Sequence, residues 1–338
     1  MSEQILPVGK LDADLLRQLL GDIPGDPSVL LGPGVGCDVA VLDDGAEQLL
    51  LAKTDPITFA TDAIGYYVVN VNANDLATSG GLPRWFLATA LLPEDKATEQ
   101  MARDIFAQII DTCRDMNIAL VGGHTEVTWG LDRPIVVGLM LGQVAPDSLV
   151  DPRGLRPGDA VITTKLAPVE GSALIAREKA DRLLEAGFSP EDIQRLADML
   201  FDPGISVLPE AQIATKAGRV TAMHDPTEGG LATGLWEMAE AGEVGLRIDR
   251  AAIPLLPEAQ SMCDLLGLDP LGLIASGSML IGCAPDDASG IVEALQEAQI
   301  PAAVIGHATA QDEGVWLVSD GQEQTLPRYD QDELTKIL

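Results

Sequence analysis

Four isolated aspartates constrain this chain most strongly, because each lies beside a glycine or a small polar residue and next to an apolar run. They are Asp38, Asp55, Asp75 and Asp225, and the segment Gly122–Glu126 closes a fifth apolar run. Carboxylates released from strand ends suit hard, oxygen-seeking cations such as Mg²⁺. Glycine lets backbone N–H groups come close to phosphate oxygens. The pattern therefore predicts a metal–nucleotide site assembled from many parts of the chain.

The length and composition favour two α/β domains. The chain has 338 residues, and a usual domain has roughly 150. Hydrophobic residues make up 46% of the chain but aromatic residues only 4%, so the cores must consist of Leu, Ile, Val and Ala. Residues 151–159 form a stiff polar connector, which predicts a boundary near residue 150.

The formal net charge of −31 excludes several kinds of partner. So acidic a surface repels nucleic acids and anionic membranes, and it repels ATP unless cations such as Mg²⁺ intervene. The four cysteines are scattered, which fits buried thiols in a reducing cytoplasm. No uncharged run reaches the roughly 18 residues that a membrane span needs, and no basic region followed by an apolar one opens the chain. We therefore expect a cytoplasmic protein.

Hydrophobic periodicity predicts a mixed α+β first half. Gly21 would cap the first helix, and the turn residues 43–45 would join the first two strands into a hairpin. The predicted helices are residues 11–20, 64–79 and 94–116, and the predicted strands are 39–42, 49–54, 85–92, 118–121 and 135–141.

The second half alternates between strands and helices, which is typical of an α/β domain. The predicted helices lie near residues 170–186, 190–200, 205–217, 229–241 and 286–298, and the predicted strands near 160–164, 219–224, 245–248, 278–284 and 302–306.

Each candidate segment also has a purely structural interpretation. The loop Gly32–Gly36 could hold phosphate or could be a simple turn. Asp55 follows a predicted strand, where ligands of α/β proteins usually bind, but it could also be a turn aspartate before proline. Asn72, Asp75 and Ser79 share one face of an otherwise apolar predicted helix, which favours either a ligand site or a buried hydrogen-bond network.

Two further segments leave the same choice open. The run 119–121 leads into Gly122 and Gly123, where backbone donors could meet a phosphate, whereas His124 alone carries little weight. The segment 223–231 contains Asp225 and could be an ordinary N-capped helix start.

Taken in order, these motifs resemble those of the AIR synthase (PurM-like) superfamily. The matching features are the glycine-rich loop with Asp38, the strand ending Thr54-Asp55, the helix with Asn74-Asp75-Leu76, the segment 122–125 and the segment 225–231. The resemblance runs from about residue 28 to about residue 310. It is greatest to the HypE branch, to which residues 252–254 and 263–270 are also similar.

The resemblance implies an α+β N-terminal domain (residues 1–150), whose sheet joins that of a second copy in a dimeric barrel, and an α/β C-terminal domain (residues 151–338). It implies ATP in a cleft at the domain and subunit boundary, and Mg²⁺ on Asp38, Asp55, Asp75 and Asp225. The implied nucleotide-binding residues are Gly34, Gly36, Asp38, Thr54, Asn72, Gly122 and Gly123. The shared chemistry is activation of a carbonyl, amide or phosphate oxygen by ATP. Lys53 would pair with a phosphate, and His124 or Glu126 would serve as acid–base or metal-shell groups.

The chain also departs from the HypE pattern. Cys37 and His124 stand where that branch has aspartates, and Glu228 stands where it has arginine. The segment 273–277 replaces an Asn-Glu-Gly segment, and no cysteine follows Cys283, whereas HypE works on a C-terminal cysteine thiol.

These departures leave three interpretations open. The first is an ATP- and Mg²⁺-dependent enzyme acting on a separate small substrate. The second is a nucleotide-binding accessory protein that associates with a partner in metallocentre maturation. The third is a carbamoyl dehydratase that uses an internal thiol such as that of Cys37.

Overall fold

The computed structural model describes Leu6, Leu11 and residues 13–21, 23–34, 36–58 and 62–337. The chain divides into two compact units. The N-terminal unit contains residues 26–33 and 38–149. The C-terminal unit contains residues 150–338 together with residues 34–37 and the first 25 residues. Residues near the start of the chain therefore belong to the C-terminal unit, although they precede the N-terminal unit in the sequence.

The N-terminal unit is built on a six-stranded sheet in the order β1-β2-β3-β6-β4-β5. All neighbouring strands are antiparallel except β4 and β5, which run parallel. The strands are β1 (Val29–Leu31), β2 (Ala40–Leu42), β3 (Leu49–Ile57), β4 (Leu82–Pro93), β5 (Ala119–Thr128) and β6 (Ile135–Val144).

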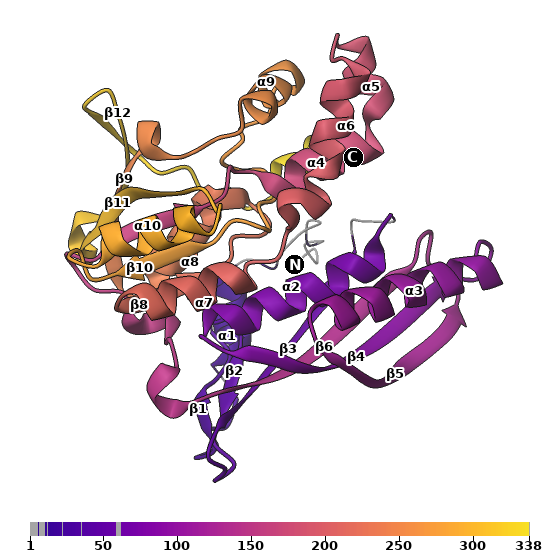
Figure 1. Cartoon of the computed structure of the whole chain (residues 1–338), viewed down its shortest axis with the longest axis horizontal. Helices are drawn as coiled ribbons and strands as arrows, with labels where there is room; N and C mark the ends of the chain where they lie inside the picture. Colours follow the sequence, from indigo (N-terminus) through magenta and orange to yellow (C-terminus); the bar gives the residue numbers. More distant parts are fainter. Residues whose placement is uncertain are drawn as a thin grey trace, which may run out of the picture. The chain divides into compact units, whose positions relative to one another are not determined.

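Two helices, α2 (Ile64–Thr78) and α3 (Glu99–Asp115), lie on one face of this sheet, as Figure 1 shows. Almost every residue of α2 is buried, including its polar residues. Gly65 allows the two helices to approach closely, because a Cβ there would lie 2.6 Å from the Ile105 carbonyl oxygen. On α3, Ile105 and Ile109 are buried. Its start at Glu99, later than predicted, follows from Thr98, whose hydroxyl caps the helix by accepting the Met101 N–H at 3.1 Å.

Strand β3 continues three residues past its predicted end at Thr54. Residues 53–57 pair with β6 but have no partner in β2, which pairs only with Leu50–Ala52. Pro56 is tolerated because a proline on an unpaired strand edge removes no ladder hydrogen bond. Asp55 therefore lies inside β3 and does not follow it.

Strand β5 also continues through the glycines that were expected to end it. It pairs with β4 from Ala119 to Thr128, with a shift of register between Phe86 and Leu87. Gly123 has a φ of 148°, and a Cβ there would lie 1.9 Å from the Ala88 carbonyl oxygen. Glycine is required because the two backbones pass so closely. Gly122 and Gly123 are therefore mid-strand residues and not a loop after a strand.

The C-terminal unit is built on a seven-stranded sheet in the order β13-β12-β9-β11-β7-β10-β8. Neighbouring strands are antiparallel except β12 and β9. The strands are β7 (Ala160–Thr164), β8 (Val220–His224), β9 (Val244–Asp249), β10 (Leu280–Cys283), β11 (Ala302–Ala310), β12 (Val315–Ser319) and β13 (Gln322–Thr325).

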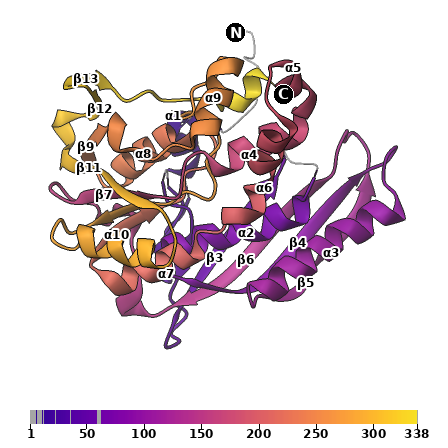
Figure 2. The ribbon, with the colours of Figure 1, turned by 45° about the horizontal axis from the view of Figure 1, so that its top comes forward.

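Helices cover both faces of this sheet. The main core joins alternate residues of the strands, such as Val161 and Leu280, to Leu235 and Met238 of α8 (Gly230–Ala241). Helices α7 (Leu208–Ala217) and α10 (Ala288–Glu297) pack side by side, α7 on β8 and α10 on β7 and β11 (Figure 2). This arrangement matches the predicted α/β character of the second half.

The remaining helices are α1 (Ala13–Leu20), α4 (Val169–Glu178), α5 (Ala180–Glu185), α6 (Pro190–Asp198) and α9 (Pro257–Leu266). The single predicted helix 170–186 is thus two helices, which meet at Lys179. The helix predicted from residue 11 begins at Ala13, and Asp12 lies outside the described residues. Strands β1, β12 and β13 and helix α9 were not predicted. Within the described part of the chain, every helix is too short or too polar to cross a lipid bilayer.

Candidate functional site

A lysine lies between two aspartates in the N-terminal unit. Lys53 and Asp55 lie two residues apart on β3, so they share the face of the sheet that α2 covers. The Lys53 Nζ lies 3.3 Å from Asp55 Oδ2 and 3.4 Å from Asp75 Oδ1 of α2. The Asp75 side chain is only 5% exposed. Charged groups therefore interrupt an otherwise apolar layer, and we call Lys53, Asp55 and Asp75 the carboxylate–lysine cluster.

Asn72 fixes the position of this cluster. Its Oδ1 accepts the Asp55 N–H at 2.9 Å, and its Nδ2 donates to the Asp55 carbonyl oxygen at 3.3 Å and to the Val68 carbonyl oxygen at 2.8 Å. The side chain is fully buried. A Cβ on Gly138 of β6 would lie 2.4 Å from Asn72 Nδ2, so this glycine makes room for the amide. Asn72 thus ties α2 to β3, which is the buried-network alternative considered from the sequence.

Thr54 does not join the cluster. Because side chains alternate along a strand, it lies on the opposite face of β3 from Lys53 and Asp55. Its hydroxyl donates to the Gly138 carbonyl oxygen at 2.7 Å. Within the N-terminal unit, the predicted residues that gather are therefore Lys53, Asp55, Asn72 and Asp75.

The glycine-rich loop has a packing role within the C-terminal unit. The Cys37 N–H donates to the Gly34 carbonyl oxygen at 3.1 Å, which holds these two residues close together. Gly36 has a φ of 73°, and a Cβ there would lie 2.7 Å from the Glu237 carbonyl oxygen of α8. Glycine at position 36 is thus required both by the left-handed backbone and by the close approach to α8. Val35 lies outside the described residues.

His124 and Glu126 lie on the edge strand β5. Two residues apart, they share a face, and His124 Nε2 lies 3.2 Å from Glu126 Oε2. Their side chains are 63% and 49% exposed within the single chain. Among the described strands, β5 has one neighbouring strand only and does not pair with β3. The pair therefore lies at the edge of the sheet, separate from the carboxylate–lysine cluster on β3 and α2.

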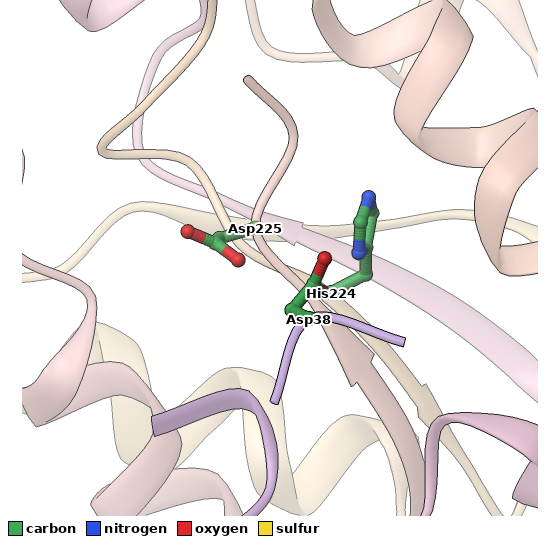
Figure 3. A group of neighbouring side chains, drawn as sticks. All are labelled: Asp38, His224 and Asp225. Carbon is green, nitrogen blue, oxygen red and sulfur yellow. The ribbon is translucent and has the colours of Figure 1, made fainter. Parts of the chain in front are cut away.

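Two further candidates close strand β8 in the C-terminal unit. His224 and Asp225 are both buried, and His224 Nε2 lies 3.0 Å from Glu237 Oε2 of α8. Figure 3 shows the side chains of His224 and Asp225 at the end of β8. The chain then turns into α8 through Gly229 and Gly230, whose φ values are 79° and 67°.

The segment 326–337 holds this turn in place, and no motif in the sequence predicted this role. Asp332 Oδ2 accepts the Gly229 N–H at 2.8 Å. Tyr329 Oη donates to Asp269 Oδ2 at 2.5 Å. The Glu333 N–H donates to the Gly272 carbonyl oxygen at 3.1 Å. We call residues 326–337 the C-terminal strap, because they bind both the start of α8 and the loop 269–273.

Two buried ionisable groups, Lys165 and Glu210, were also not predicted from the sequence. Lys165 Nζ lies 3.0 Å from Glu210 Oε1, and it donates to the carbonyl oxygens of Gly204 and Ser206 at 3.0 and 2.6 Å. Burial lowers the pKa of Lys165, and the neighbouring Glu210 carboxylate offsets part of this decrease. This pair joins the end of β7 to α7 and has a structural role.

The carboxylate–lysine cluster fits a magnesium–phosphate group chemically. Asp55 and Asp75 come from neighbouring elements and face one ammonium group. Carboxylate oxygens are the protein ligands that Mg²⁺ prefers, and a lysine ammonium group pairs readily with phosphate. Because Asp75 is buried and Asn72 holds the backbone of Asp55, these groups are positioned before any ligand binds.

These features define a class of two-unit α/β proteins with a partly buried charged cluster on the first sheet and a glycine turn at the start of a helix in the second unit. Family models specify the class further. The model for the N-terminal domain of AIR synthase related protein matches residues 36–144, and the model for the C-terminal domain matches residues 156–318. The chain belongs to the AIR synthase related protein family.

Relatives of known sequence agree with this assignment. A hydrogenase expression/formation protein of Methanocaldococcus jannaschii is 32% identical over 285 residues, which cover 82% of this chain and 81% of that protein. The carbamoyl dehydratase HypE of Cupriavidus necator is 31% identical over 271 residues, covering 77% of this chain and 73% of that one.

Solved structures share the fold. The hydrogenase maturation protein HypE in complex with ATP gives a TM-score of 0.72 at 22% identity and covers 96% of each chain. A chain of the HypE–HypF complex gives a TM-score of 0.75 at 20% identity, covering 93% of this chain and 99% of that one. The chain thus has the PurM-like two-domain architecture that the sequence motifs implied.

Proposed function

We propose that the chain is a cytoplasmic ATP- and Mg²⁺-dependent enzyme that activates a carbonyl, amide or phosphate oxygen of a small substrate by phosphoryl transfer. The observation that carries this proposal is the carboxylate–lysine cluster, which brings two carboxylates, one of them buried, to the same ammonium group between β3 and α2. Phosphoryl transfer depends mainly on positioning and on electrostatic stabilisation, and both require groups fixed in advance. The solved complex of HypE with ATP supports the nucleotide.

In this proposal the N-terminal domain (residues 1–150) carries the nucleotide and dimerisation functions, and the C-terminal domain (residues 151–338) completes the enzyme. Asp38, Asp55, Asp75 and Asp225 would hold Mg²⁺. Lys53 would neutralise a phosphate oxygen. When bound, Mg²⁺ would polarise the transferred phosphoryl group, and the chain's own carboxylates would keep the ion in place.

The test compares Asp55→Asn and Asp75→Asn with the control Asp95→Asn, which changes an exposed turn before α3. Calorimetry with a non-hydrolysable ATP analogue, with and without Mg²⁺, measures binding, and ADP release measures turnover. Both cluster variants should lose Mg²⁺-dependent binding by about tenfold or more, which corresponds to about 1.4 kcal/mol, and should lose turnover, while the control matches the parent. Full activity in both cluster variants with an intact fold would exclude the proposed role.

We further propose that the enzyme is a homodimer in which two N-terminal sheets form a barrel. Strand β5 supports this, because it is a ten-residue edge strand that is exposed along most of its length. Val121 and Val127 are exposed on it, and Trp129, which follows it, is 81% exposed. Long exposed edge strands with apolar side chains are templates for pairing with another chain. In such a dimer His124 and Glu126 would lie at the interface.

Sedimentation velocity tests the dimer. Val121→Lys should shift the population toward the monomer, whereas Leu184→Lys, at an exposed apolar position of α5, should leave it unchanged. A parent protein that sediments as a monomer at all accessible concentrations would refute the barrel.

A second candidate function is that of a nucleotide-binding accessory protein in hydrogenase-type metallocentre maturation. The support is the family of relatives named for hydrogenase maturation and the solved complex of HypE with HypF. This alternative predicts ATP binding with negligible ADP release and a stable complex with a maturation protein, so the same turnover assay separates it from the enzyme.

A further inference from the structure

Helix α8 begins on two glycines, which have no side chain to fix their own conformation. Gly229 and Gly230 have φ values of 79° and 67°, so both lie in the left-handed region. A Cβ on Gly229 would lie 2.4 Å from the Thr233 hydroxyl oxygen, and one on Gly230 would lie 2.4 Å from the Leu271 carbonyl oxygen. Glycine is therefore required here, although it loses more conformational freedom on folding than any other residue. The turn thus depends on contacts from elsewhere in the C-terminal unit to keep this one conformation.

Those contacts come from segments that are distant in the sequence. Asp332 of the C-terminal strap is 7% exposed, and its Oδ2 accepts the Gly229 N–H at 2.8 Å. Its Oδ1 accepts the Leu334 N–H at 2.8 Å, so both carboxylate oxygens are used. The Leu271 carbonyl oxygen accepts the Ala232 N–H at 3.0 Å. Asp332 therefore supplies, from 103 residues away, a hydrogen bond at the helix start of the kind that local side chains usually supply.

The strap is itself anchored around Asp332. Tyr329 Oη donates to Asp269 Oδ2 at 2.5 Å, and Glu333 Oε2 accepts the Asp269 N–H at 2.9 Å. A Cβ on Gly272 would lie 2.6 Å from Tyr329 Cε1, so the tyrosine ring packs directly on that backbone. Tyr329 precedes Asp332 in the strap and Glu333 follows it. The carboxylate of Asp332 is therefore held in one place by contacts on both sides.

The turn before α8 in its turn determines where Asp225 lies. Asp225 lies at the end of β8 (Figure 3), and Pro226 is the next residue. A Cβ on Gly234 of α8 would lie 2.6 Å from Pro226 Cβ, so Pro226 packs directly on the helix. The Thr227 carbonyl oxygen accepts the Gly230 N–H at 3.0 Å, which joins this segment to the helix start. A shift of the start of α8 would therefore move Pro226 and, with it, the Asp225 carboxylate.

We propose that Asp332 is a positioning residue, which caps the turn before α8 and thereby sets the place of the Asp225 carboxylate. The inference rests on the proposed function, in which Asp225 holds Mg²⁺. Asp332 acts on the ion only through the turn. Mg²⁺ demands near-ideal octahedral geometry, with ligand oxygens at about 2.0–2.1 Å, so a displaced carboxylate holds it less tightly. Loss of the cap should therefore weaken Mg²⁺-dependent binding more than the binding of the metal-free nucleotide.

Hydrogen exchange of the full-length protein, without nucleotide or metal, tests whether Asp332 holds the turn. Asp332→Ala removes both acceptors and leaves Asp225 in the chain. We expect the amides of residues 227–233 to exchange about tenfold faster or more, because this turn opens more readily without its cap, and the amides of β10 to keep the parent's rates. Unchanged exchange of residues 227–233 would overturn the proposal.

Ser189→Ala is the matched control for this experiment. The Ser189 hydroxyl oxygen accepts the Asp192 N–H at 3.0 Å at the start of α6, so the variant also removes a helix cap from the C-terminal unit. Exchange of residues 227–233 should match the parent in this variant. Equal acceleration there by Ser189→Ala and by Asp332→Ala would show a general loss of stability, and the specific role of Asp332 would be refuted.

Calorimetry with a non-hydrolysable ATP analogue tests the effect on the metal ligand. The ratio of the affinities with and without Mg²⁺ should fall by about tenfold in Asp332→Ala, while the affinity without Mg²⁺ stays that of the parent. A merely structural residue would leave this ratio unchanged in the folded protein. In the Asp225→Asn background, Asp332→Ala should change the ratio no further, because the two residues act in series. An unchanged ratio, or equal losses in both backgrounds, would overturn the positioning role.

Asp332→Asn decides if Asp332→Ala fails to fold. It keeps the size of the side chain but offers one acceptor oxygen to two N–H groups, so the exchange and the ratio should shift in the same directions by smaller factors. Parent values for both would refute the proposal. A parent whose nucleotide binding does not depend on Mg²⁺ overturns the proposed function, and the metal part of this inference with it. The exchange experiment contains neither ATP nor Mg²⁺, so it separates that failure from a failure of Asp332 to hold the turn.

Discussion

The buried Glu170 carboxyl makes a quantitative prediction about stability and pH. A glutamate side chain in the unfolded chain has a pKa near 4.5, whereas burial in the folded C-terminal unit raises the pKa of Glu170 to about 8. The folded protein therefore binds this proton more tightly than the unfolded protein does. The linked stabilisation is fully present below the unfolded pKa and is lost as the pH rises through the folded pKa. The window is thus about pH 4.5 to 8.

The magnitude follows from these two pKa values. At pH 6 the linkage contributes about 3 kcal/mol to the free energy of unfolding, and at pH 9 it contributes almost nothing. Glu170→Gln keeps the shape of the side chain and removes the titration. The difference in unfolding free energy between Glu170→Gln and the parent should therefore change by about 3 kcal/mol in favour of the variant between pH 6 and pH 9.

Urea unfolding followed by tryptophan fluorescence measures this difference, since Trp236 and Trp316 both lie in the C-terminal unit. Glu185→Gln serves as the exposed control and should follow the parent at both pH values. A difference that stays constant between pH 6 and pH 9 would show that Glu170 titrates normally, and the argument from its burial would then be wrong.

Three further substitutions test other contacts by the same unfolding measurement. Asn72→Ala removes the side chain that bonds to Asp55, and should cost about 1–3 kcal/mol; an unchanged midpoint would contradict its bracing role. Gly36→Ala should cost about 1–3 kcal/mol because the backbone is left-handed there, whereas Gly45→Ala, with open space around it, tests the conformation alone. Lys165→Met leaves Glu210 buried without its cation and should cost about 3–5 kcal/mol, and adding Glu210→Met should recover much of that loss.

Periodicity predicted the elements whose burial pattern is regular. Ile105 and Ile109 mark the buried face of α3, and both lie where a helix of 3.6 residues per turn places them. The alternation of strands and helices after residue 160 likewise predicted the α/β unit. What periodicity could not supply is the order of strands in each sheet, since pairing joins residues far apart in the chain.

The two wrong strand ends have one cause. Pro56 and Gly122 were treated as breakers, but each lies where its local rule does not apply. Pro56 has an unpaired edge beside it, and Gly123 continues the strand because β4 passes too closely for a side chain. Such exceptions depend on the neighbouring strand, which local sequence does not specify.

The site was predictable where polar residues interrupt apolar runs. That rule found Asp55, Asn72 and Asp75, which the structure brings together, but it also included Thr54, which lies on the other face of β3. It missed Glu170, although that residue also interrupts an apolar run, because a single glutamate near a helix start is an ordinary feature. Asp332 could not be found in this way, since its role depends on Gly229, about a hundred residues earlier.

The placement of α1 has a consequence for how the chain is made. Arg17 of α1 pairs with Glu240 of α8, at 3.0 Å through its Nε and with a sequence separation of 223 residues. During translation α1 leaves the ribosome long before its partner exists. At roughly 5–20 residues per second the delay is on the order of 10 to 45 s. The whole N-terminal sheet is synthesised within that interval, so the first helix of the chain is among the last to find its place.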